Sequence, residues 1–212
     1  MEDNNQQNEL VQNENVKEKK SLKSFGNDLI EIVESTFITI FVIILIFTYL
    51  LHPVNVVGMS MVPTLNNEDR IFMSMITNDI SCGDIIVINN DSAYLLDGNG
   101  EVYASPSDQL NECIIKRVIA CGGQEVNIDF ETHEITVDGV VLDEPYINAP
   151  TARNQGAFEY PFVVPEGYYF VMGDNRNESA DSRNPLVGLI KKEQIYGKAV
   201  IRYAPLSDFK IL

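Results

Sequence analysis

The chain has 212 residues and a formal net charge of −16, because 31 aspartates and glutamates outnumber 15 lysines and arginines. This length allows one or two small domains, and the scarcity of cations argues against a nucleic-acid-binding surface. Three scattered cysteines, Cys82, Cys113 and Cys121, offer neither a zinc-ligand spacing nor a disulfide framework. We therefore expect no metal, no cofactor and free thiols, with a Cys113–Cys121 pair left open.

The N-terminal residues 1–34 are polar and include eight acidic residues. We expect residues 1–16, which are rich in Asn, Gln and Glu, to be disordered. Apolar residues then recur at helical spacing between positions 22 and 33, which indicates an interfacial helix that leads into a membrane.

Residues 35–51, STFITIFVIILIFTYLL, form a run of 17 uncharged and mostly apolar residues. With a turn at each end the run can span about 30 Å of hydrocarbon, and Pro53 is expected to end the helix. A buried core helix is less favoured, because few core helices are apolar on every face. The long acidic segment before it is unlike a cleaved signal, although Gly58-Met59-Ser60 leaves cleavage open. We predict a membrane anchor at residues 35–54.

The distribution of cations predicts the orientation of this anchor. Four lysines lie between positions 17 and 23, whereas Arg70 is the first cation after the anchor. Under the positive-inside rule, residues 1–34 form a cytoplasmic tail and residues 55–212 lie outside. We therefore expect a single-pass protein of the cell membrane, in contact with the lipid bilayer.

Residues 55–212 contain short runs dense in Val, Ile and Tyr, separated by Gly and Asp, which is typical of strands and turns. Asp138-Gly139 is a hairpin signal, and no segment shows sustained helical periodicity. We expect a mainly β fold, in which the single transmembrane helix precedes an antiparallel, barrel-like β domain. The predicted strands lie at residues 85–89, 113–120, 134–142, 168–172 and 198–203.

A serine and a lysine are the best candidates for catalysis. His52 and His133 have no motif around them, so a Ser-His-Asp triad is poorly supported, while paired carboxylates stay open in so acidic a chain. Ser60 precedes a Pro-Thr turn, and Lys116 lies in a strand that is apolar on both faces. Burial lowers the pKa of a lysine, and a neutral amine can act as general base for a serine. The alternatives are an inert loop serine and a lysine that extends to the rim of the sheet.

Four sequence blocks follow the anchor: GMSMVPTL at 58–65, CGDIIVI at 82–88, IIKRVIACGG at 114–123 and GDNRNESADSR at 173–183. This series resembles the type I signal peptidases, membrane-anchored serine endopeptidases of the peptidase S26 type with a Ser–Lys dyad. With its single anchor, the chain is similar to the Gram-positive form of these signal peptidases. The resemblance implies a monomeric enzyme whose catalytic domain, residues 55–212, carries a smaller β-hairpin subdomain as a variable insertion at 121–170.

The resemblance also implies roles for individual residues. Ser60 would be the nucleophile, its N–H would donate to the oxyanion, and Lys116 would be the general base. In some relatives a serine two places before the nucleophile supplies its hydroxyl as a second oxyanion donor. Here that position is Gly58, which can supply only a backbone donor. Ser179 would hydrogen-bond the lysine amine. The supporting residues would be Asp174, Arg176, Asp181 and Arg183, the last two as an ion pair.

The implied substrates are the signal peptides of preproteins, cleaved after small-x-small sequences such as Ala-x-Ala. The substrate backbone would add as a β-strand beside residues 56–58 and 114–116. The anchor would raise the local concentration of substrates that are themselves tethered to the membrane. The residues expected to wall the apolar pockets are Val56, Val57, Met61, Leu65, Ile114 and Ile115.

Two rival interpretations remain. A repressor-type autoprotease shares the Ser–Lys dyad, but the anchor and the net charge argue against it. A catalytically inactive, membrane-anchored peptide-binding relative would tolerate substitution of Ser60 or Lys116, whereas an enzyme would not.

Overall fold

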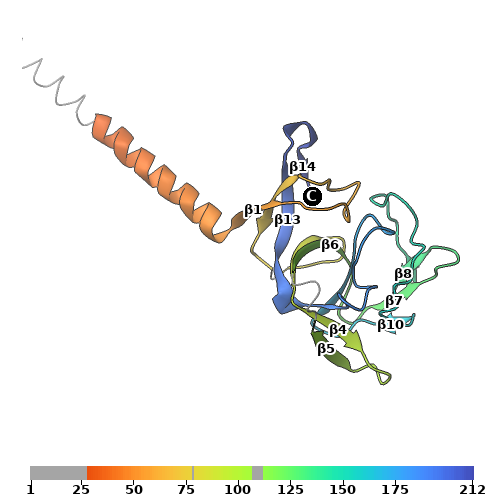
Figure 1. Cartoon of the computed structure of the whole chain (residues 1–212). Coiled ribbons are helices and arrows are strands. Elements are labelled where there is room, and N and C mark those ends of the chain that lie inside the picture. The colour runs from red at the N-terminus through yellow and green to blue at the C-terminus, as the bar shows by residue number, and fades with distance from the viewer. Residues whose placement is uncertain (1–27, 78, 107–111) are drawn as a thin grey trace, which may run out of the picture. The chain divides into compact units, whose positions relative to one another are not determined.

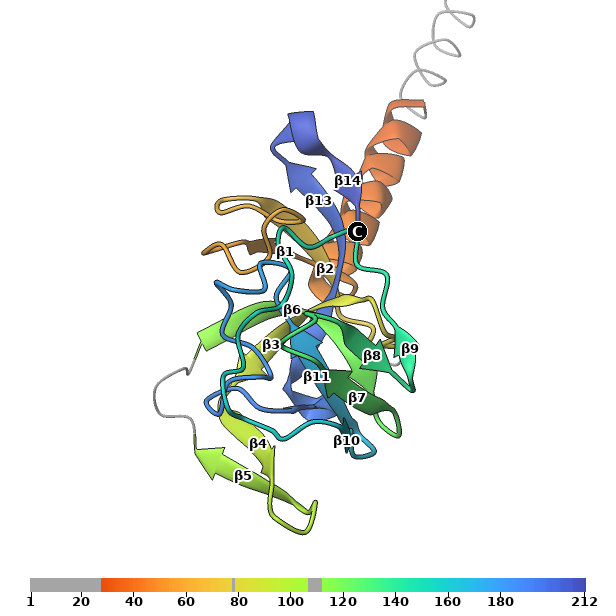
Figure 2. The ribbon, with the colours of Figure 1, turned by 90° about the vertical axis from the view of Figure 1, so that its right-hand side faces the viewer.

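The computed structural model describes residues 28–77, 79–106 and 112–212 and divides into two compact units, residues 1–48 and 49–212 (Figure 1, Figure 2). The tail expected to be disordered, residues 1–16, lies outside the described residues, as do residues 22–27 of the expected interfacial helix.

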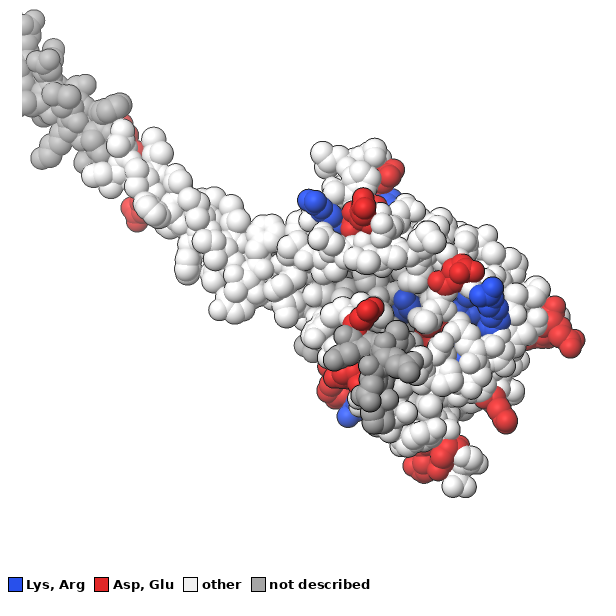
Figure 3. Space-filling model, in the orientation of Figure 1, with Lys and Arg blue, Asp and Glu red and all other residues white. Residues whose placement is uncertain are grey.

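One long helix, Asp28–Tyr49, begins the described part of the chain. Its 22 residues are apolar enough to cross a membrane, and its most apolar window is not buried within the molecule. Charged side chains occur only near its N-terminal end, as Figure 3 shows. The helix starts before the uncharged run at residue 35 and ends at Tyr49, earlier than Pro53 suggested.

The chain enters a β-strand almost directly after this helix. β1 (Leu51–Asn55) pairs antiparallel with β2 (Arg70–Ser74) over its whole length. Because β1 has one neighbour among the described strands and so forms an edge of the sheet, it tolerates Pro53, which lacks an N–H to donate. Residues 51–54, which we expected to belong to the anchor, are therefore part of a sheet.

An eight-stranded antiparallel sheet forms the centre of the second unit. In pairing order its strands are β1, β2, β13 (Ile195–Ala204), β3 (Ile85–Asn90), β6 (Glu112–Cys121), β11 (Tyr168–Met172) and β12 (Ile190–Lys191), with β14 (Lys210–Ile211) added to β13. Among the described residues the terminal strands β1 and β12 do not pair with each other, so this barrel-like sheet stays open. The mainly β, antiparallel fold expected from the sequence is confirmed.

β6 is fixed by apolar packing on both of its faces. Val118 belongs to one buried cluster, together with Ile86 of β3 and Val171 of β11. Ile115 packs against a second cluster, which contains Met61 and Leu65. Burial of such side chains contributes about 1.5–3 kcal/mol each, so the strand that carries Lys116 is held rigidly in the sheet.

Two smaller sheets complete the unit. β10 (Phe162–Val163), β7 (Glu125–Ile128), β8 (Ile135–Val137) and β9 (Val140–Val141) form one sheet inside the predicted insertion, and β4 (Ser92–Leu96) and β5 (Val102–Pro106) form a hairpin. Asp138 and Gly139 join β8 to β9 with φ values of 52° and 74°, the backbone of a type I′ hairpin turn. Two short 3-10 helices, η1 (Lys192–Gln194) and η2 (Leu206–Asp208), flank β13.

Candidate active site

Ser60 lies in the loop between β1 and β2, and this loop is pinned at several points. The N–H of Gly58, whose φ is +91°, donates to Asn67 Oδ1 at 2.9 Å. Asn175 donates its backbone N–H to Ser60 O at 2.9 Å and its Nδ2 to Met59 O at 3.0 Å. The serine is therefore held by its own loop and by the loop that follows β11.

Lys116, on β6, reaches this serine from the sheet. Its Nζ lies 2.9 Å from Ser60 Oγ and 2.9 Å from Ile115 O, and the residue is only 3% exposed. The sequence separates the two residues by 56 positions, yet the sheet brings the lysine against the hydroxyl. This burial excludes the alternative in which Lys116 extends to the rim of the sheet.

Burial sets the protonation of this lysine. Loss of hydration disfavours an ammonium ion in the interior, which lowers the pKa of Lys116 from 10.5 to about 8, although the carboxylates of Asp181 and Asp174 raise it in part. A substantial fraction of the amine is therefore neutral near pH 8, and a neutral amine can accept the proton of the serine hydroxyl with which it is in contact.

Ser179 stands beside the dyad without the hydrogen bond expected of it. The residue is 5% exposed, and its Oγ has no hydrogen-bond partner in the part of the chain that the structure describes. Gly173 separates it from Ser60: a Cβ at position 173 would lie 2.3 Å from Ser179 Oγ and 2.5 Å from Ser60 O. Only glycine allows the two serines to approach this closely.

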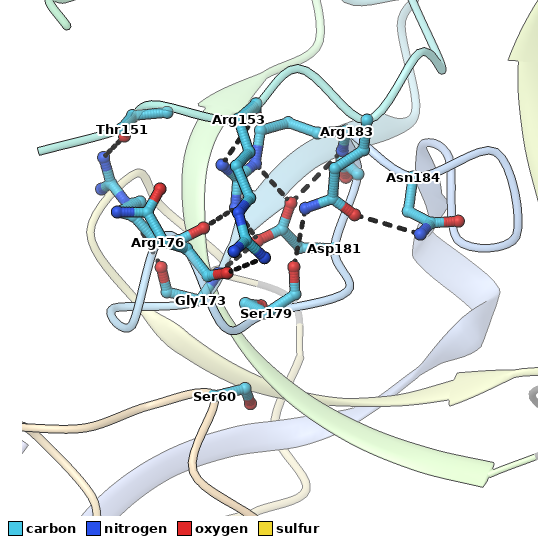
Figure 4. Close-up of polar contacts among 12 residues, drawn as sticks. Ser60, Thr151, Arg153, Gly173, Arg176, Ser179, Asp181, Arg183 and Asn184 are labelled. Atoms are coloured by element: carbon cyan, nitrogen blue, oxygen red, sulfur yellow. Dashed lines mark hydrogen bonds and ion pairs between the residues drawn. The ribbon is translucent and has the colours of Figure 1, made fainter.

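The wall behind Ser179 is an ion pair shielded from solvent (Figure 4). Arg183 donates Nε to Asp181 Oδ1 and Nη2 to Asp181 Oδ2, both at 2.8 Å, and neither side chain is exposed. Asp181 Oδ2 also accepts the N–H of Gly173 at 3.0 Å. The pair expected between positions 181 and 183 is thus present, and it anchors the glycine between the serines.

Asp174 and Arg176 take partners that sequence reasoning missed. Arg117 donates Nε and Nη2 to the two carboxylate oxygens of Asp174 at 2.8 and 2.6 Å. Arg176 pairs with Glu144, and the Arg117 guanidinium lies 4.1 Å from the centre of the Tyr146 ring. Arg117 adjoins Lys116 in the same sequence block, which was an available signal, whereas nothing in the local sequence singles out Glu144 or Tyr146.

A groove of about 330 Å³ runs beside the dyad. Of the residues expected to wall apolar pockets, Val56, Val57, Met61, Ile114 and Ile115 line it together with Ser60 and Lys116. Leu65 does not: it is fully buried in the cluster with Met61 and Ile71, because the loop turns it toward β2. The other lining residues are Val54, Asn55, Gly58, Val87, Glu112 and Cys113.

One edge of β6 is open along this groove. β3 pairs with β6 at residues 112–117, whereas β11 pairs with it only from Arg117 to Cys121. Among the described residues, segment 112–116 therefore has a sheet neighbour on one side only. Such an edge offers unpaired N–H and C=O groups to an extended peptide.

No group of three or more metal-ligating side chains occurs within residues 28–77, 79–106 and 112–212.

The sequence matches the family described as signal peptidase, peptidase S26, over residues 29–204. Signal peptidase I S of Bacillus subtilis is 31% identical over 210 residues, covering 94% of this chain and 98% of the relative. Signal peptidase I of Bacillus amyloliquefaciens is 33% identical over 200 residues, covering 90% and 93%. Signal peptidase IB of Staphylococcus aureus is 28% identical over 200 residues, covering 86% and 93%.

The chain belongs to the signal peptidase family, peptidase S26. It is accordingly a serine endopeptidase, and the apolar helix Asp28–Tyr49 makes it a membrane-anchored one. The resemblance drawn from the four sequence blocks is confirmed.

Proposed function

We propose that this enzyme removes signal peptides from secreted preproteins by cleavage after small-x-small sequences, with Ser60 as nucleophile and Lys116 as general base. The contact of 2.9 Å between Lys116 Nζ and Ser60 Oγ carries this proposal. The lowered pKa of Lys116 supports it, because the amine must be neutral to accept a proton.

In the proposed mechanism, Lys116 accepts the hydroxyl proton while Ser60 Oγ attacks the scissile carbonyl. The resulting ammonium then protonates the departing amine, which leaves an acyl-enzyme on Ser60. The same amine activates water for the second half-reaction. Ile115 O accepts a hydrogen bond from Nζ at 2.9 Å, which orients the lysine toward the serine through both steps.

The oxyanion is stabilised, in this proposal, by the N–H of Ser60. The N–H of Gly58 is already donated to Asn67 Oδ1, so the loop as it stands has no free donor from Gly58 in that role. A second donor would require the Gly58–Asn67 bond to open when substrate binds.

The substrate would bind in extended form between the Ser60 loop and the open edge of β6. Val56 already donates its N–H to Asp69 O and accepts from the N–H of Glu68. Val57, which is 88% exposed, is therefore the residue of this loop best placed to pair with the peptide. The small groove volume suits short side chains, in keeping with Ala-x-Ala.

The proposed orientation puts the N-terminus in the cytoplasm and residues 55–212 outside, because lysines are concentrated before the helix. We propose that the enzyme acts as a monomer on preproteins held in the same membrane, without nucleic acid.

Cleavage of an Ala-x-Ala preprotein by the full chain in detergent tests the dyad. Ser60→Ala and Lys116→Ala should each lower kcat/KM by at least about 10³-fold, whereas the exposed Ser207→Ala and Lys192→Ala serve as matched controls with unchanged activity. Equal cleavage by wild type and the dyad variants would refute the mechanism. Binding of the peptide without cleavage by any form would favour the peptide-binding relative instead.

A further inference from the structure

Two cysteines lie in contact at the C-terminal end of β6, beyond Lys116. Cys82, in the turn before β3, places its Sγ 2.9 Å from Sγ of Cys121, the last residue of β6, although 39 positions separate them. Cys113 is eight residues back along the same strand, about 26 Å from Cys121 at the usual rise of a strand. The Cys113–Cys121 pairing that the sequence left open is therefore wrong.

The backbone holds the turn of Cys82 against β6. Gly83 donates its N–H to Val118 O, and Val118 donates its N–H to Asp84 O, both at 2.8 Å. These bonds lie beyond the last paired residues of β3 and β6, Ile85 and Arg117, and they hold the turn that carries Cys82 close to the end of β6. The two sulfurs, 2.9 Å apart, therefore meet where hydrogen bonds already hold the two segments together, as a disulfide requires.

A third side chain holds both cysteines in place. Gln124 Oε1 accepts hydrogen bonds from Cys82 Sγ at 3.0 Å and from the N–H of Cys121 at 2.9 Å. Its Nε2 donates to Asp138 Oδ2 at 3.0 Å. The thiol contact is thus part of an ordered arrangement that connects the turn, β6 and the β8–β9 hairpin.

The contact also makes one of the thiols more reactive. The hydrogen bond from the Cys121 thiol lowers the pKa of Cys82 from 9.0 to about 7, against partial burial and the carboxylates of Asp138 and Asp84, which raise it. A thiol with a pKa near neutrality is substantially present as thiolate, the form that attacks disulfides.

We propose that Cys82 and Cys121 form a disulfide bond, with Cys113 left as a free thiol. The Cys82 thiolate attacks a disulfide-bearing oxidant and expels one of its sulfurs as thiolate, which gives a mixed disulfide. Cys121, deprotonated, then attacks Cys82 Sγ and expels the second sulfur. The two protein thiols lose two electrons and two protons, and the oxidant is reduced to two thiols. Formation in the cell rests on the orientation proposed above, because disulfides persist outside the cytoplasm.

The bond would fasten a segment that bears on the catalytic strand. Arg117, the neighbour of Lys116, donates Nη1 to Gly83 O at 2.8 Å, and Gly83 follows Cys82 directly. Closing the loop between the two cysteines would restrict the unfolded chain and stabilise the domain.

Peptide mapping of the full chain in detergent, after equilibration with oxidised glutathione and alkylation, tests the proposal without reference to cleavage or orientation. We expect one cross-linked peptide pair containing Cys82 and Cys121, about 2 Da lighter than the sum of the reduced peptides, and alkylated Cys113. Reduction should lower Tm by about 5–15 °C in wild type and in the matched Cys113→Ser variant, and should leave Tm unchanged in Cys82→Ser. Three alkylated cysteines in the oxidised wild type, or a link that involves Cys113, would overturn the proposal.

Discussion

The Arg183–Asp181 ion pair behind the candidate active site differs from Lys116, which contacts Ser60, in how well its surroundings stabilise a buried charge. Arg183 is matched on several sides, by both oxygens of Asp181 and by the carbonyls of Arg176 and Arg153. Lys116, also buried, has two acceptors among the described residues, Ser60 Oγ and Ile115 O, for the three N–H groups of an ammonium ion. The charge of Arg183 is therefore matched by acceptors on several sides, whereas burial drives Lys116 toward its neutral form.

Within one small region of the molecule, the Arg183–Asp181 pair therefore supports the structure, whereas Lys116 is reactive. A fully hydrogen-bonded ion pair such as Arg183–Asp181 fixes the geometry around it, which suits a supporting role. An under-solvated amine is reactive because its surroundings fail to stabilise its charge. Asp181 serves both regions, since it pairs with Arg183 and also raises the pKa of Lys116, which limits how far that pKa falls.

Breaking the wall should have the largest effect on stability. Arg183→Ala leaves the carboxylate of Asp181 buried and unpaired, so we expect the free energy of unfolding to fall by about 3–5 kcal/mol in urea titration. Arg153→Ala is the matched control: Arg153 and Glu178 form an exposed pair at 3.8 Å, and its loss should change stability by less than about 0.5 kcal/mol. Similar losses in both variants would show that burial of the pair does not matter.

Removing the buried amine of Lys116 should raise the free energy of unfolding rather than lower it. The folded-state pKa of Lys116 is about 8 against 10.5 ordinarily, so the unfolded chain binds more protons between these values and wild-type stability rises with pH across that window. Below pH 8 the cost is fully present, at about 3 kcal/mol. Lys116→Met should therefore raise the free energy of unfolding at pH 7 and abolish this pH dependence, unlike the exposed Lys192→Met. A less stable Lys116→Met variant would contradict this.

The rate should depend on pH through the same group. Because the neutral amine is the active form, log kcat/KM is expected to rise with unit slope as the pH increases toward about 8 and to level off above it. Each pH unit below the pKa lowers the rate about tenfold. A rate that is flat between pH 5 and 7, measured with an uncharged peptide substrate, would exclude Lys116 as the base.

The smallest effect is expected at Ser179. Its hydroxyl is buried without a partner among the described residues, so Ser179→Ala should leave stability unchanged or raise it by up to about 1 kcal/mol. If the hydroxyl orients Lys116 during turnover, kcat/KM should still fall about tenfold. Ser207→Ala, at an exposed position, should change neither quantity, and a marked loss of stability in Ser179→Ala would reveal a stabilising contact for the hydroxyl.

The sequence singled out Ser60 and Lys116, which the structure brings into contact, and it predicted the strands β3, β6, β11 and β13, because each lies in a short block with a local signal. It did not identify the pairs Arg117–Asp174 and Arg176–Glu144, whose members are 57 and 32 positions apart and meet only when loops fold onto the sheet. It also missed several strands, among them β1 and β4, since Leu51–Asn55 reads as the end of an apolar helix and Ser92–Leu96 matches no family block. In both segments tertiary pairing outweighs local pattern.

The open edge of β6 along residues 112–116 bears on solubility as well as on the substrate binding proposed above. An unpaired strand edge attracts any extended chain, including a second copy of the same protein, and natural sheets guard such edges with charge. Glu112 stands exposed at the start of this segment, in a domain that is itself acidic. Its carboxylate repels the same edge of another copy, which opposes self-association in a crowded membrane through the edge that is proposed to receive the peptide.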